Sequence, residues 1–371
     1  MKILLINYEY PPIGAGAANA CYYLAKEMVA LGNEVVVLTA GYQKNVGYQC
    51  EEGIHIYRLA SRRKKVSSSG ILEMVSYLFY ARMNLEKVIT KHGIEKSIIF
   101  FSIPCGILGS VLKRKFKIPY VISLRGGDVP GMEKGINWIH RLITPIRRKI
   151  LRDANCVVAN SEGLARASEN ADPYKVEIIP NGVDTKFFFP TEKEEEGDFV
   201  FLFVGRFQTQ KNLSVLLSVF SSLRNRSWRL LLVGDGPLKS DLIEQCKVLG
   251  IPEKVEFLPW QGKEGLRTLY QQADALVNYS LYEGMPNVVL EAMACGLPII
   301  ASKIMGHEEM IFDGQNGFLV TLGNEMELKE RIEKMLSLDS FKLRMLSENS
   351  RHLVQQKYSW KGVGEGYMDV L

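Results

Sequence analysis

The sequence predicts an α/β protein made of two doubly wound, Rossmann-like domains. Short apolar runs of strand length alternate with helical patterns along the chain, and this alternation breaks off near the middle and starts again. The length of 371 residues allows two hydrophobic cores. Alternating strands and helices form parallel sheets covered by helices on both faces. We therefore expect two domains facing each other across a cleft.

The first half of the chain contains one series of expected strands and helices. The strands are the apolar runs at residues 2–7, 34–39, 98–101, 120–124, 156–159 and 176–179. Residues 19–31 and 162–168 have helical periodicity, and Ser161 is placed to cap the second helix. A cluster of turn residues at 180–184 ends the series.

The second series follows a polar run at residues 191–198. Its expected strands are residues 199–205, 230–234, 255–257, 275–278, 298–302 and 317–320. We place the first domain at residues 1–185 and the second at residues 186–357.

Composition and charge exclude several classes of protein. Hydrophobic residues make up 47% and charged residues 23%, which is ordinary for a soluble globular protein. No apolar run reaches the roughly 18–20 residues that span a bilayer, and the apolar N-terminus is too short for a signal peptide. The six cysteines lack CxxC spacing and the five histidines form no metal motif. These features predict a cytoplasmic protein with reduced cysteines and no metal site.

The positive charge is concentrated in the first domain. Residues 1–185 hold 25 Lys and Arg against 16 Asp and Glu, whereas the remainder holds 21 against 25. Such asymmetry suits an anionic membrane surface or an acidic acceptor, although solvated surface charges are an equally good explanation. No nucleic-acid motif accompanies the basic clusters, so we expect no nucleic-acid partner.

Residues 283–298 are the most informative segment of the chain. Pro286 suits the first position of a short helix, and Gly296 suits its C-terminal cap. The helix N-terminus favours phosphate, because its N–H groups and its dipole both attract an anion. Glu283 and Glu291 flank this site, and carboxylates beside a phosphate are better suited to bind hydroxyls. Phosphate next to hydroxyls suggests a nucleotide-sugar.

The segment resembles the E-x7-E signature of retaining glycosyltransferases with the GT-B fold, the group known as family 4 or group 1. The stretch from Gly205 through Arg206 to Lys211 and Asn212 resembles the GR-x4-KN element of that family. The resemblance implies that both cations neutralise the leaving nucleoside diphosphate. It also implies metal-independent transfer of a sugar from a UDP-, GDP- or ADP-sugar to a hydroxyl acceptor, with no other cofactor.

The resemblance extends over essentially the whole chain and assigns the site residues. The catalytic residues are expected to be Arg206, Lys211 and Glu283. The residues expected to contact the donor are Gly14, Gly16, Gly205, Arg206, Lys211, Gly234, Glu283, Gly284, Met285, Pro286, Asn287 and Glu291. Trp260 lies where relatives contact the base, with stacking and packing as equal alternatives.

The loop after the first strand contains Gly14 and Gly16 and resembles the Pro-Pro-x-x-Gly-Gly loop of the family, with Ala15 in place of one glycine. A dinucleotide fingerprint is a poor alternative, because the third glycine is missing and Thr39 stands where an acidic residue would bind ribose. Arg125 and Asp128 are expected on the acceptor and sugar side, where relatives carry a histidine. Arg125 suits a charged group of the ligand, or else an ion pair with Asp128.

Two further expectations concern the first domain. The Tyr-Ser-Trp sequence at residues 358–360 resembles the family ending, which implies that a helix of about 358–371 returns to this domain despite its three glycines. The aromatic-rich helical segment 71–83 follows the basic residues 62–65, so it is either a core helix or a contact with anionic membrane. The acceptor would be a glycan or lipid-linked molecule, as in cell-surface polysaccharide synthesis, with the enzyme peripheral at the inner membrane face.

Two other classes remain as alternatives to the glycosyltransferase. One is a sugar-nucleotide epimerase on the same kind of fold, and the other is a nucleotide-sugar-binding protein without catalysis. Neither needs both the carboxylates Glu283 and Glu291 and the cations Arg206 and Lys211.

Overall fold

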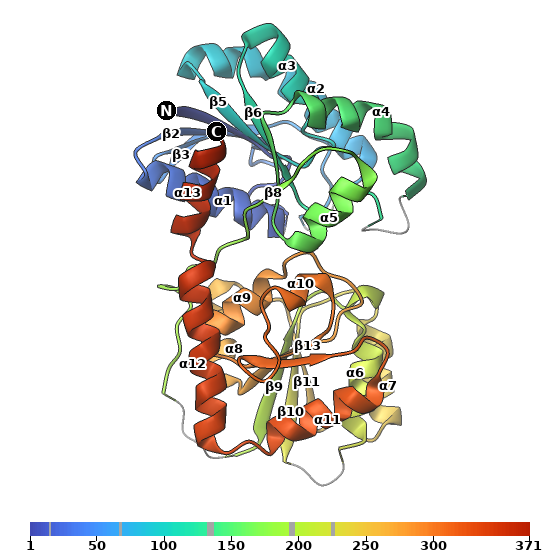
Figure 1. Ribbon diagram of the computed structural model, residues 1–371. Coiled ribbons are helices and arrows are strands. Elements are labelled where there is room, and N and C mark those ends of the chain that lie inside the picture. Colours follow the sequence, from blue (N-terminus) through green and yellow to red (C-terminus); the bar gives the residue numbers. More distant parts are fainter. Residues whose placement is uncertain (15, 67–68, 132–136, 193–196, 224–226) are drawn as a thin grey trace. The chain divides into compact units, whose positions relative to one another are not determined.

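The computed structural model describes residues 1–14, 16–66, 69–131, 137–192, 197–223 and 227–371 (Figure 1). The chain divides into two compact units. Unit 1 contains Met1–Asn181 together with Trp360–Leu371, and unit 2 contains Gly182–Ser359. Ala15 and four residues of the polar run at 191–198 lie outside the described residues.

Unit 1 is built on an eight-stranded sheet in the order β3-β4-β2-β1-β5-β6-β7-β8. All neighbours are parallel except the β3–β4 hairpin. The strands are β1 (Lys2–Ile6), β2 (Glu34–Ala40), β3 (Gly47–Glu51), β4 (Ile54–Leu59), β5 (Lys96–Phe100), β6 (Tyr120–Leu124), β7 (Cys156–Ala159) and β8 (Glu177–Ile178). The helices are α1 (Gly16–Ala30), α2 (Ile71–His92), α3 (Ile107–Val111), α4 (Asn137–Asp153), α5 (Glu162–Ala171) and α13 (Trp360–Val370), and a π-helical turn (Leu112–Phe116) follows α3.

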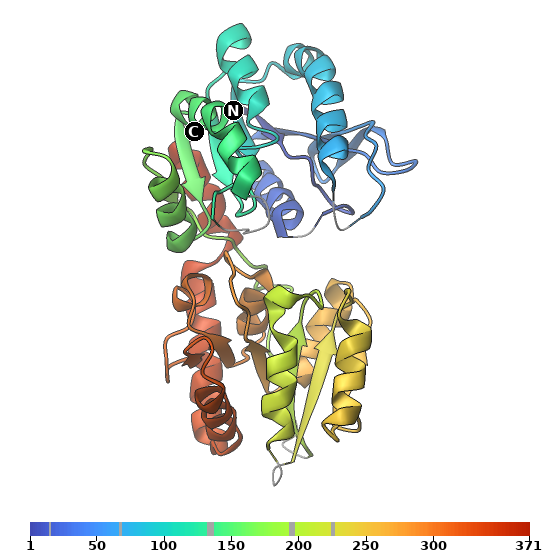
Figure 2. The ribbon, with the colours of Figure 1, turned by 90° about the vertical axis from the view of Figure 1, so that its right-hand side faces the viewer.

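Unit 2 is built on a six-stranded parallel sheet in the order β11-β10-β9-β12-β13-β14. The strands are β9 (Phe199–Val204), β10 (Trp228–Val233), β11 (Val255–Leu258), β12 (Ala275–Asn278), β13 (Ile299–Ser302) and β14 (Gly317–Val320). The helices are α6 (Leu213–Ser221), α7 (Lys239–Val248), α8 (Lys263–Gln272), α9 (Asn287–Ala294), α10 (Met305–Glu308), α11 (Glu325–Leu336) and α12 (Ser340–Lys357). Helices cover both faces of each sheet, as the two views of the ribbon show (Figures 1 and 2).

The central strands of both sheets are buried on both faces. Residues Ile3–Ile6 of β1 are fully buried, and so are Phe201–Phe203 of β9. Such continuous apolar runs are typical of parallel strands, because helices cover both sides of the sheet. This is why the apolar runs in the sequence identified the strands so directly.

Most strand expectations are confirmed to within two residues at each end. The strands β6, β7, β12 and β14 agree at both ends, and Ser161 caps α5 by accepting the N–H of Leu164 at 3.2 Å. The β3–β4 hairpin was missed. Every residue of β3 is exposed and polar residues alternate with apolar ones in β4, so neither strand has the apolar run used as the signal.

Helix α13 packs against α1 within unit 1. Trp360 stacks on Tyr23 with ring centroids 5.0 Å apart, and the Tyr367 hydroxyl lies 2.6 Å from the Ser123 hydroxyl. A Cβ on Gly364 would come within 3.0 Å of Glu27 Cβ, so this glycine allows the two helices to approach closely. Packing therefore compensates for the low helix propensity of the glycines in this helix.

No helix in the described part of the chain is long and apolar enough to cross a bilayer. The six cysteines are all free thiols, of which Cys21, Cys105, Cys246 and Cys295 are buried.

Candidate nucleotide-sugar site

The candidate site of unit 2 lies where its strand order reverses. Strands β9, β10 and β11 run outward to one side of the sheet, and β12, β13 and β14 run to the other. The loops that follow β9 and β12 therefore leave the sheet in opposite directions, which opens a crevice at the carboxyl ends of these strands. Ligands of open α/β sheets bind at such a crevice. The loop after β9 carries Arg206 and Lys211, and the loop after β12 carries Glu283.

Lys211 and Glu283 form an ion pair across this crevice. The Lys211 ammonium bonds the Glu283 carboxylate, and both side chains are largely buried. The Gln210 amide donates to the Tyr282 carbonyl at 2.7 Å and approaches the other Glu283 oxygen at 3.5 Å. An ammonium has three N–H donors, so Lys211 can hold Glu283 and still donate to a phosphate. The sequence predicted both residues at the site but not their pairing.

Two glycines, Gly234 and Gly306, allow the site loops to approach each other at backbone contact. A Cβ on Gly234 would lie 2.1 Å from the Gly205 carbonyl oxygen. A Cβ on Gly306, in α10, would lie 2.1 Å from the Gly284 carbonyl oxygen. Any side chain at these positions would displace the loops that carry Arg206 and Glu283. The sequence predicts that Gly234 and Gly205 contact the donor, and the structure shows that their backbones touch each other.

Helix α9 begins one residue later than the sequence suggested. Pro286 is the N-cap residue and not the first helical residue, and its carbonyl accepts the N–H of Val289 at 3.1 Å. The prediction for the C-terminus is confirmed, because Gly296 has φ +81° just beyond the cap. Its N–H bonds the Met293 carbonyl, and the next N–H bonds the Ala292 carbonyl, which is a Schellman motif. Both ends of the helix are fixed, so its N-terminus has a defined position.

Glu291 lies on α9 in an apolar environment. Desolvation raises the pKa of its carboxyl to about 7, against the opposing effects of the Tyr270 hydroxyl and Lys263. The buried Tyr270 donates to Glu291 Oε2 at 3.0 Å. One carboxylate oxygen thus has a fixed donor, and the other is suited to accept from a ligand hydroxyl. Sequence reasoning identified Glu291 but not Tyr270, because Tyr270 belongs to α8 and meets α9 only in the fold.

Arg206 and Trp260 are exposed side chains beside the same edge of the sheet. Arg206 follows β9 after Gly205, and Trp260 follows β11 after Pro259 and is 77% exposed. This exposure removes packing as the explanation for Trp260. Its indole face is available to stack on a planar ligand.

His307 is a buried polar residue next to the site, and no role was predicted for it from the sequence. Its Nδ1 lies 2.9 Å from the Ser302 carbonyl, and its buried Nε2 has no hydrogen-bond partner among the described residues. Burial lowers the pKa of His307. Its Nδ1 is the donor to Ser302, because a carbonyl oxygen can only accept. The only feature of the sequence that could have drawn attention to His307 is its place directly after Gly306.

In unit 1 the loop after β1 contains the two expected glycines. Gly14 has φ +94°, and its N–H donates to the Val66 carbonyl at 2.8 Å. A Cβ at Gly14 would come within 2.9 Å of both Glu9 and Ala18. Gly16 is exposed and is the first residue of α1. Gly14 therefore shapes the loop, and Gly16 places no side chain at the start of α1.

Arg125 and Asp128 lie in the loop after β6 but do not form the ion pair considered from sequence. The Arg125 guanidinium donates to Asn181 Oδ1 at 2.8 Å and lies over the Phe100 ring at 4.4 Å. The buried Asp128 carboxylate accepts the backbone N–H groups of Arg125 and Ser102 at 2.9 and 2.6 Å. Asp128 thus fixes the conformation of the loop. Arg125 is partly exposed, whereas Asp128 is buried.

Comparison with known proteins identifies the family. The model of glycosyl transferases group 1 matches residues 184–353, and the model of glycosyltransferase family 4 matches residues 14–187. The two matches together span both units. The chain belongs to glycosyltransferase family 4.

This glycosyltransferase is similar over its full length to a relative known by sequence and to proteins of known structure. An uncharacterised glycosyltransferase of Methanocaldococcus jannaschii is 28% identical, and the match covers 100% of this chain and 97% of the relative. Sucrose-phosphate synthase of Thermosynechococcus elongatus has a TM-score of 0.84 at 22% identity, over 100% and 98% of the two chains. The Anabaena protein HepE, solved with UDP and glucose, has a TM-score of 0.77 at 20% identity, over 100% and 98%. The glycosyltransferase therefore has the GT-B fold, as the sequence predicted.

Proposed function

We propose that this glycosyltransferase moves a sugar from a nucleoside diphosphate donor to a hydroxyl acceptor and retains the configuration at the anomeric carbon. The observation that carries the proposal is the Lys211–Glu283 pair at the strand-order reversal of unit 2, beside the N-terminus of α9. A cation, a helix N-terminus and a carboxylate meet there, which suits a diphosphate bound next to sugar hydroxyls. Glu291, on the same helix, then binds the ribose hydroxyls.

In this mechanism the protein stabilises charge and supplies no covalent nucleophile. The bond between the anomeric carbon and the diphosphate oxygen breaks, and its electron pair leaves with the diphosphate. Arg206, Lys211 and the N-terminus of α9 stabilise the negative charge that develops there. The acceptor oxygen bonds the anomeric carbon on the face that the diphosphate leaves, and its proton passes to a diphosphate oxygen. Glu283 binds the sugar hydroxyls and favours the positive charge that develops on the ring.

We propose that this chemistry needs no metal at the donor site. Two cationic side chains and a helix N-terminus would stabilise the negative charge of the diphosphate. In other phosphate sites a divalent cation stabilises this charge. Metal independence follows if transfer continues at full rate in a chelator.

We propose a UDP-sugar as the first donor to test, because HepE, which shares the fold, was solved with UDP and glucose. Gly234, Gly284, Met285 and Asn287 would surround the diphosphate and sugar, and Trp260 would stack on the base. GDP- and ADP-sugars are the alternative donors.

Transfer and hydrolysis of UDP-, GDP- and ADP-glucose test the proposed activity. We expect nucleoside diphosphate release, and NMR should show that the first product has the anomeric configuration of the donor. Lys211→Ala and Glu283→Ala should each lower kcat by ~10²–10³-fold, as for loss of one group that stabilises transition-state charge. Arg229→Ala, an exposed arginine of β10 in the same unit, is the matched control and should keep full activity. Inverted product, or full turnover in Glu283→Ala, would refute the mechanism.

We propose that unit 1 binds the acceptor and contacts anionic membrane through α2. One face of this helix belongs to the core, with Tyr77 and Leu85 buried. Its outer face exposes large apolar side chains, including Leu72 at 78% and Phe79 at 61%. The exposed cations Arg62, Lys64 and Lys65 precede this face. An apolar helix face next to exposed cations fits the interface of an anionic bilayer.

Arg63, the remaining residue of the basic cluster 62–65, has a structural role. Arg63 is buried and donates to the Lys65 and Val66 carbonyls and to Glu9. A test of membrane contact must therefore leave Arg63 unchanged.

Flotation with vesicles tests the membrane contact. Wild type should float with phosphatidylglycerol vesicles but not with phosphatidylcholine vesicles. The double variant Leu72→Ser/Phe79→Ser and the triple variant Arg62→Gln/Lys64→Gln/Lys65→Gln should remain at the bottom of the gradient. Phe341→Ser removes an equally exposed aromatic of unit 2 and should float like wild type. If wild type does not float, or if both multiple variants float normally, the contact does not exist.

A further inference from the structure

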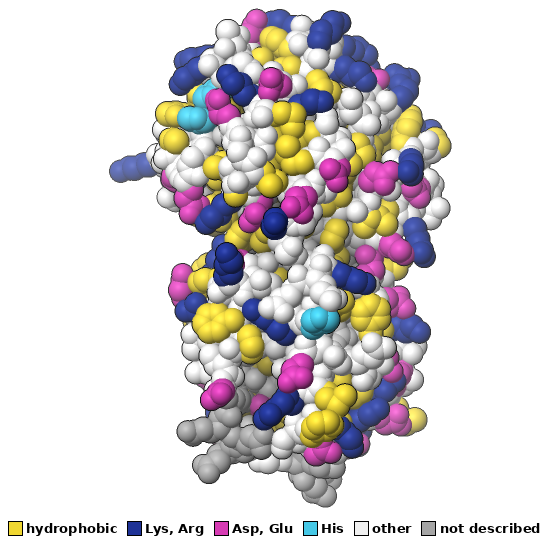
Figure 3. Space-filling view, turned by 60° about the vertical axis from the view of Figure 1, so that its left-hand side comes forward, with side chains coloured by type: hydrophobic (Ala, Val, Ile, Leu, Met, Phe, Trp, Pro, Cys, Tyr) yellow, Lys and Arg dark blue, Asp and Glu magenta, His cyan; other side chains and the backbone are white. Residues whose placement is uncertain are grey.

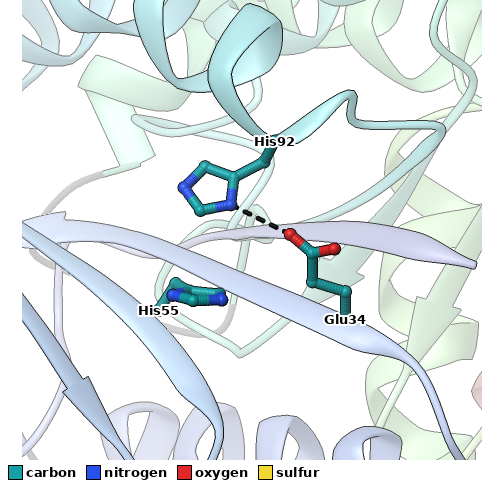
Figure 4. A group of neighbouring side chains, drawn as sticks. All are labelled: Glu34, His55 and His92. Carbon is teal, nitrogen blue, oxygen red and sulfur yellow. Dashed lines mark hydrogen bonds and ion pairs between the residues drawn. The ribbon is translucent and has the colours of Figure 1, made fainter.

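Three potential metal ligands that are far apart in the sequence meet near the N-terminal ends of strands in unit 1. Glu34 is the first residue of β2, His55 is in β4, and His92 is the last residue of α2. One ligand atom from each of the three side chains lies within 4.8 Å of the other two. The two imidazole rings lie one above the other with the carboxylate beside them (Figure 4). No such group was expected from the sequence, because the hairpin that carries His55 was not predicted.

The hydrogen bonds around these histidines favour metal binding. Tyr48 Oη lies 2.8 Å from His55 Nδ1, and Tyr57 Oη lies 2.8 Å from His92 Nε2. Each ring thus has a hydroxyl partner on one nitrogen, which leaves Nε2 of His55 and Nδ1 of His92 as ligand atoms. Metal-bound histidines usually have such a partner on the second nitrogen, because it fixes the tautomer and the orientation of the ring.

The distances are close to those of a zinc site. His92 Nδ1 lies 3.0 Å from Glu34 Oε1, an interaction marked by the dashed line in Figure 4. Ligand atoms around a tetrahedral zinc ion are separated by roughly 3.3 Å. The most distant ligand atoms, which lie within 4.8 Å of each other, therefore need to approach by about 1.5 Å at most to enclose the ion. The side chains move easily, because Glu34 and His55 are only half-buried.

We propose that Glu34, His55 and His92 bind a divalent transition metal ion of the zinc class, with a fourth position open to water. Neutral imidazoles and a carboxylate are a ligand set that zinc prefers. When the ion binds, it replaces the contact between His92 Nδ1 and Glu34, and His92 takes the tautomer whose Nε2–H donates to Tyr57. The site is accessible because Glu34 and His55 are only half-buried. Figure 3 shows histidine side chains beside an acidic one at the surface of unit 1.

The position of the site indicates a structural effect and not a catalytic one. Glu34 and His55 lie at the N-terminal ends of their strands, whereas the loops with Gly14 and Arg125 follow the C-terminal ends of β1 and β6. Because the strands are parallel, these two sets of residues lie at opposite ends of the strands. The ion would join β2, β4 and the end of α2, and so attach the exposed hairpin to the rest of unit 1. This inference is independent of the proposed activity.

Two cations limit the affinity of the site. Lys2 Nζ lies 3.9 Å from the second Glu34 oxygen, and Lys91 lies over the rings of Tyr48 and Tyr57 at 4.7 and 5.6 Å. Both repel a second positive charge. We therefore expect micromolar affinity, which is weaker than that of structural zinc sites with four protein ligands.

Titration of the full-length, chelator-treated protein with Zn²⁺ tests the proposal. Calorimetry should give one site per chain, and Zn²⁺ should raise the melting temperature. Co²⁺ should bind at the same site and give the visible absorption bands of a four-coordinate ion. His55→Gln, a change at a half-buried position, should weaken binding at least tenfold, and Glu34→Gln should also weaken it.

Two control variants separate this site from other zinc ligands of the chain. His352→Gln removes an exposed histidine of α12, and Cys50→Ser removes the thiol that is directly opposite His55 in the hairpin. Both should bind Zn²⁺ like wild type. Circular dichroism without metal shows whether His55→Gln is folded, and Glu34→Gln provides the second variant if it is not. The proposal is wrong if wild type does not bind Zn²⁺, if folded His55→Gln binds it equally well, or if Cys50→Ser or His352→Gln abolishes binding.

Discussion

At the scale of single residues, the candidate site shows how two opposite charges are held ready for a ligand. Lys211 and Glu283 come from different loops, and their ion pair fixes both side chains at the crevice between β9 and β12. The ion pair uses only part of the three N–H donors of Lys211, so the ammonium can still donate to a ligand. The residue types were evident from sequence, whereas their contact depends on the order of the strands in the sheet.

The raised pKa of Glu291 predicts a pH-dependent cost in stability. Between about pH 4.5 and 7 the unfolded chain loses this proton while the folded chain keeps it, so the free energy of unfolding falls as pH rises through this window. Glu291→Gln removes that loss. The variant should therefore gain stability relative to wild type between pH 5 and pH 7.5, by up to ~3 kcal/mol.

Urea unfolding at several pH values measures this difference. Glu264→Gln, at an exposed position of α8, is the matched control. A stability difference between Glu291→Gln and wild type that stays constant from pH 5 to pH 7.5 would show that Glu291 is not strongly desolvated.

At the scale of elements, local signals in the sequence were sufficient for most of unit 2. The apolar runs of the strands and the cap at Gly296 depend only on neighbouring residues, so they could be predicted. The β3–β4 hairpin could not, because its outer strand is wholly exposed and gains its stability from pairing with β4. The contacts of Gly306 with the Glu283 loop were also invisible, since they join elements from different parts of the chain.

Gly306→Ala should weaken donor binding more than it weakens folding. The added Cβ meets the Gly284 carbonyl oxygen at 2.1 Å, so the loop that carries Glu283 must move. Overpacking of this kind costs ~1–3 kcal/mol, which corresponds to roughly 5- to 150-fold in the Kd of the diphosphate if the loop absorbs it. Calorimetric titration with the nucleoside diphosphate measures the loss.

Gly262→Ala provides the control for this prediction. Its Cβ would meet nothing closer than Glu264 Oε2 at 3.8 Å, so it should bind the diphosphate like wild type. Equal affinity in Gly306→Ala and Gly262→Ala would mean that the backbone contact does not position the site.

At the scale of the whole molecule, the sequence predicted two α/β units and the GT-B fold because the strand and helix pattern restarts once. It could not show how α13 is held, since Tyr23, Ser123 and Glu27 meet this helix only through the fold. The metal cluster of unit 1 was equally hidden, because Glu34, His55 and His92 have no motif spacing.

Trp360→Ala should destabilise unit 1 although it changes a residue near the end of the chain. Trp360 is buried against Tyr23, and a Trp→Ala change in a core costs ~3–5 kcal/mol. Hydrogen exchange should show faster exchange in α1 and the β1–β2 region, with unit 2 unchanged. Equal loss of protection in both units, or none in unit 1, would contradict the assignment of α13 to unit 1.

We propose that the loops after β9 and β12 bind the diphosphate of a nucleotide-sugar. Thermal melting with UDP, GDP and ADP at matched concentrations, for wild type and Arg206→Ala, tests it most directly. A diphosphate at ~100 times its Kd adds ~2.7 kcal/mol of stability. We expect one of the three to raise the melting temperature of wild type and of Arg229→Ala, and we expect Arg206→Ala to lose this shift. No shift with any diphosphate, or an equal shift in Arg206→Ala, would contradict it.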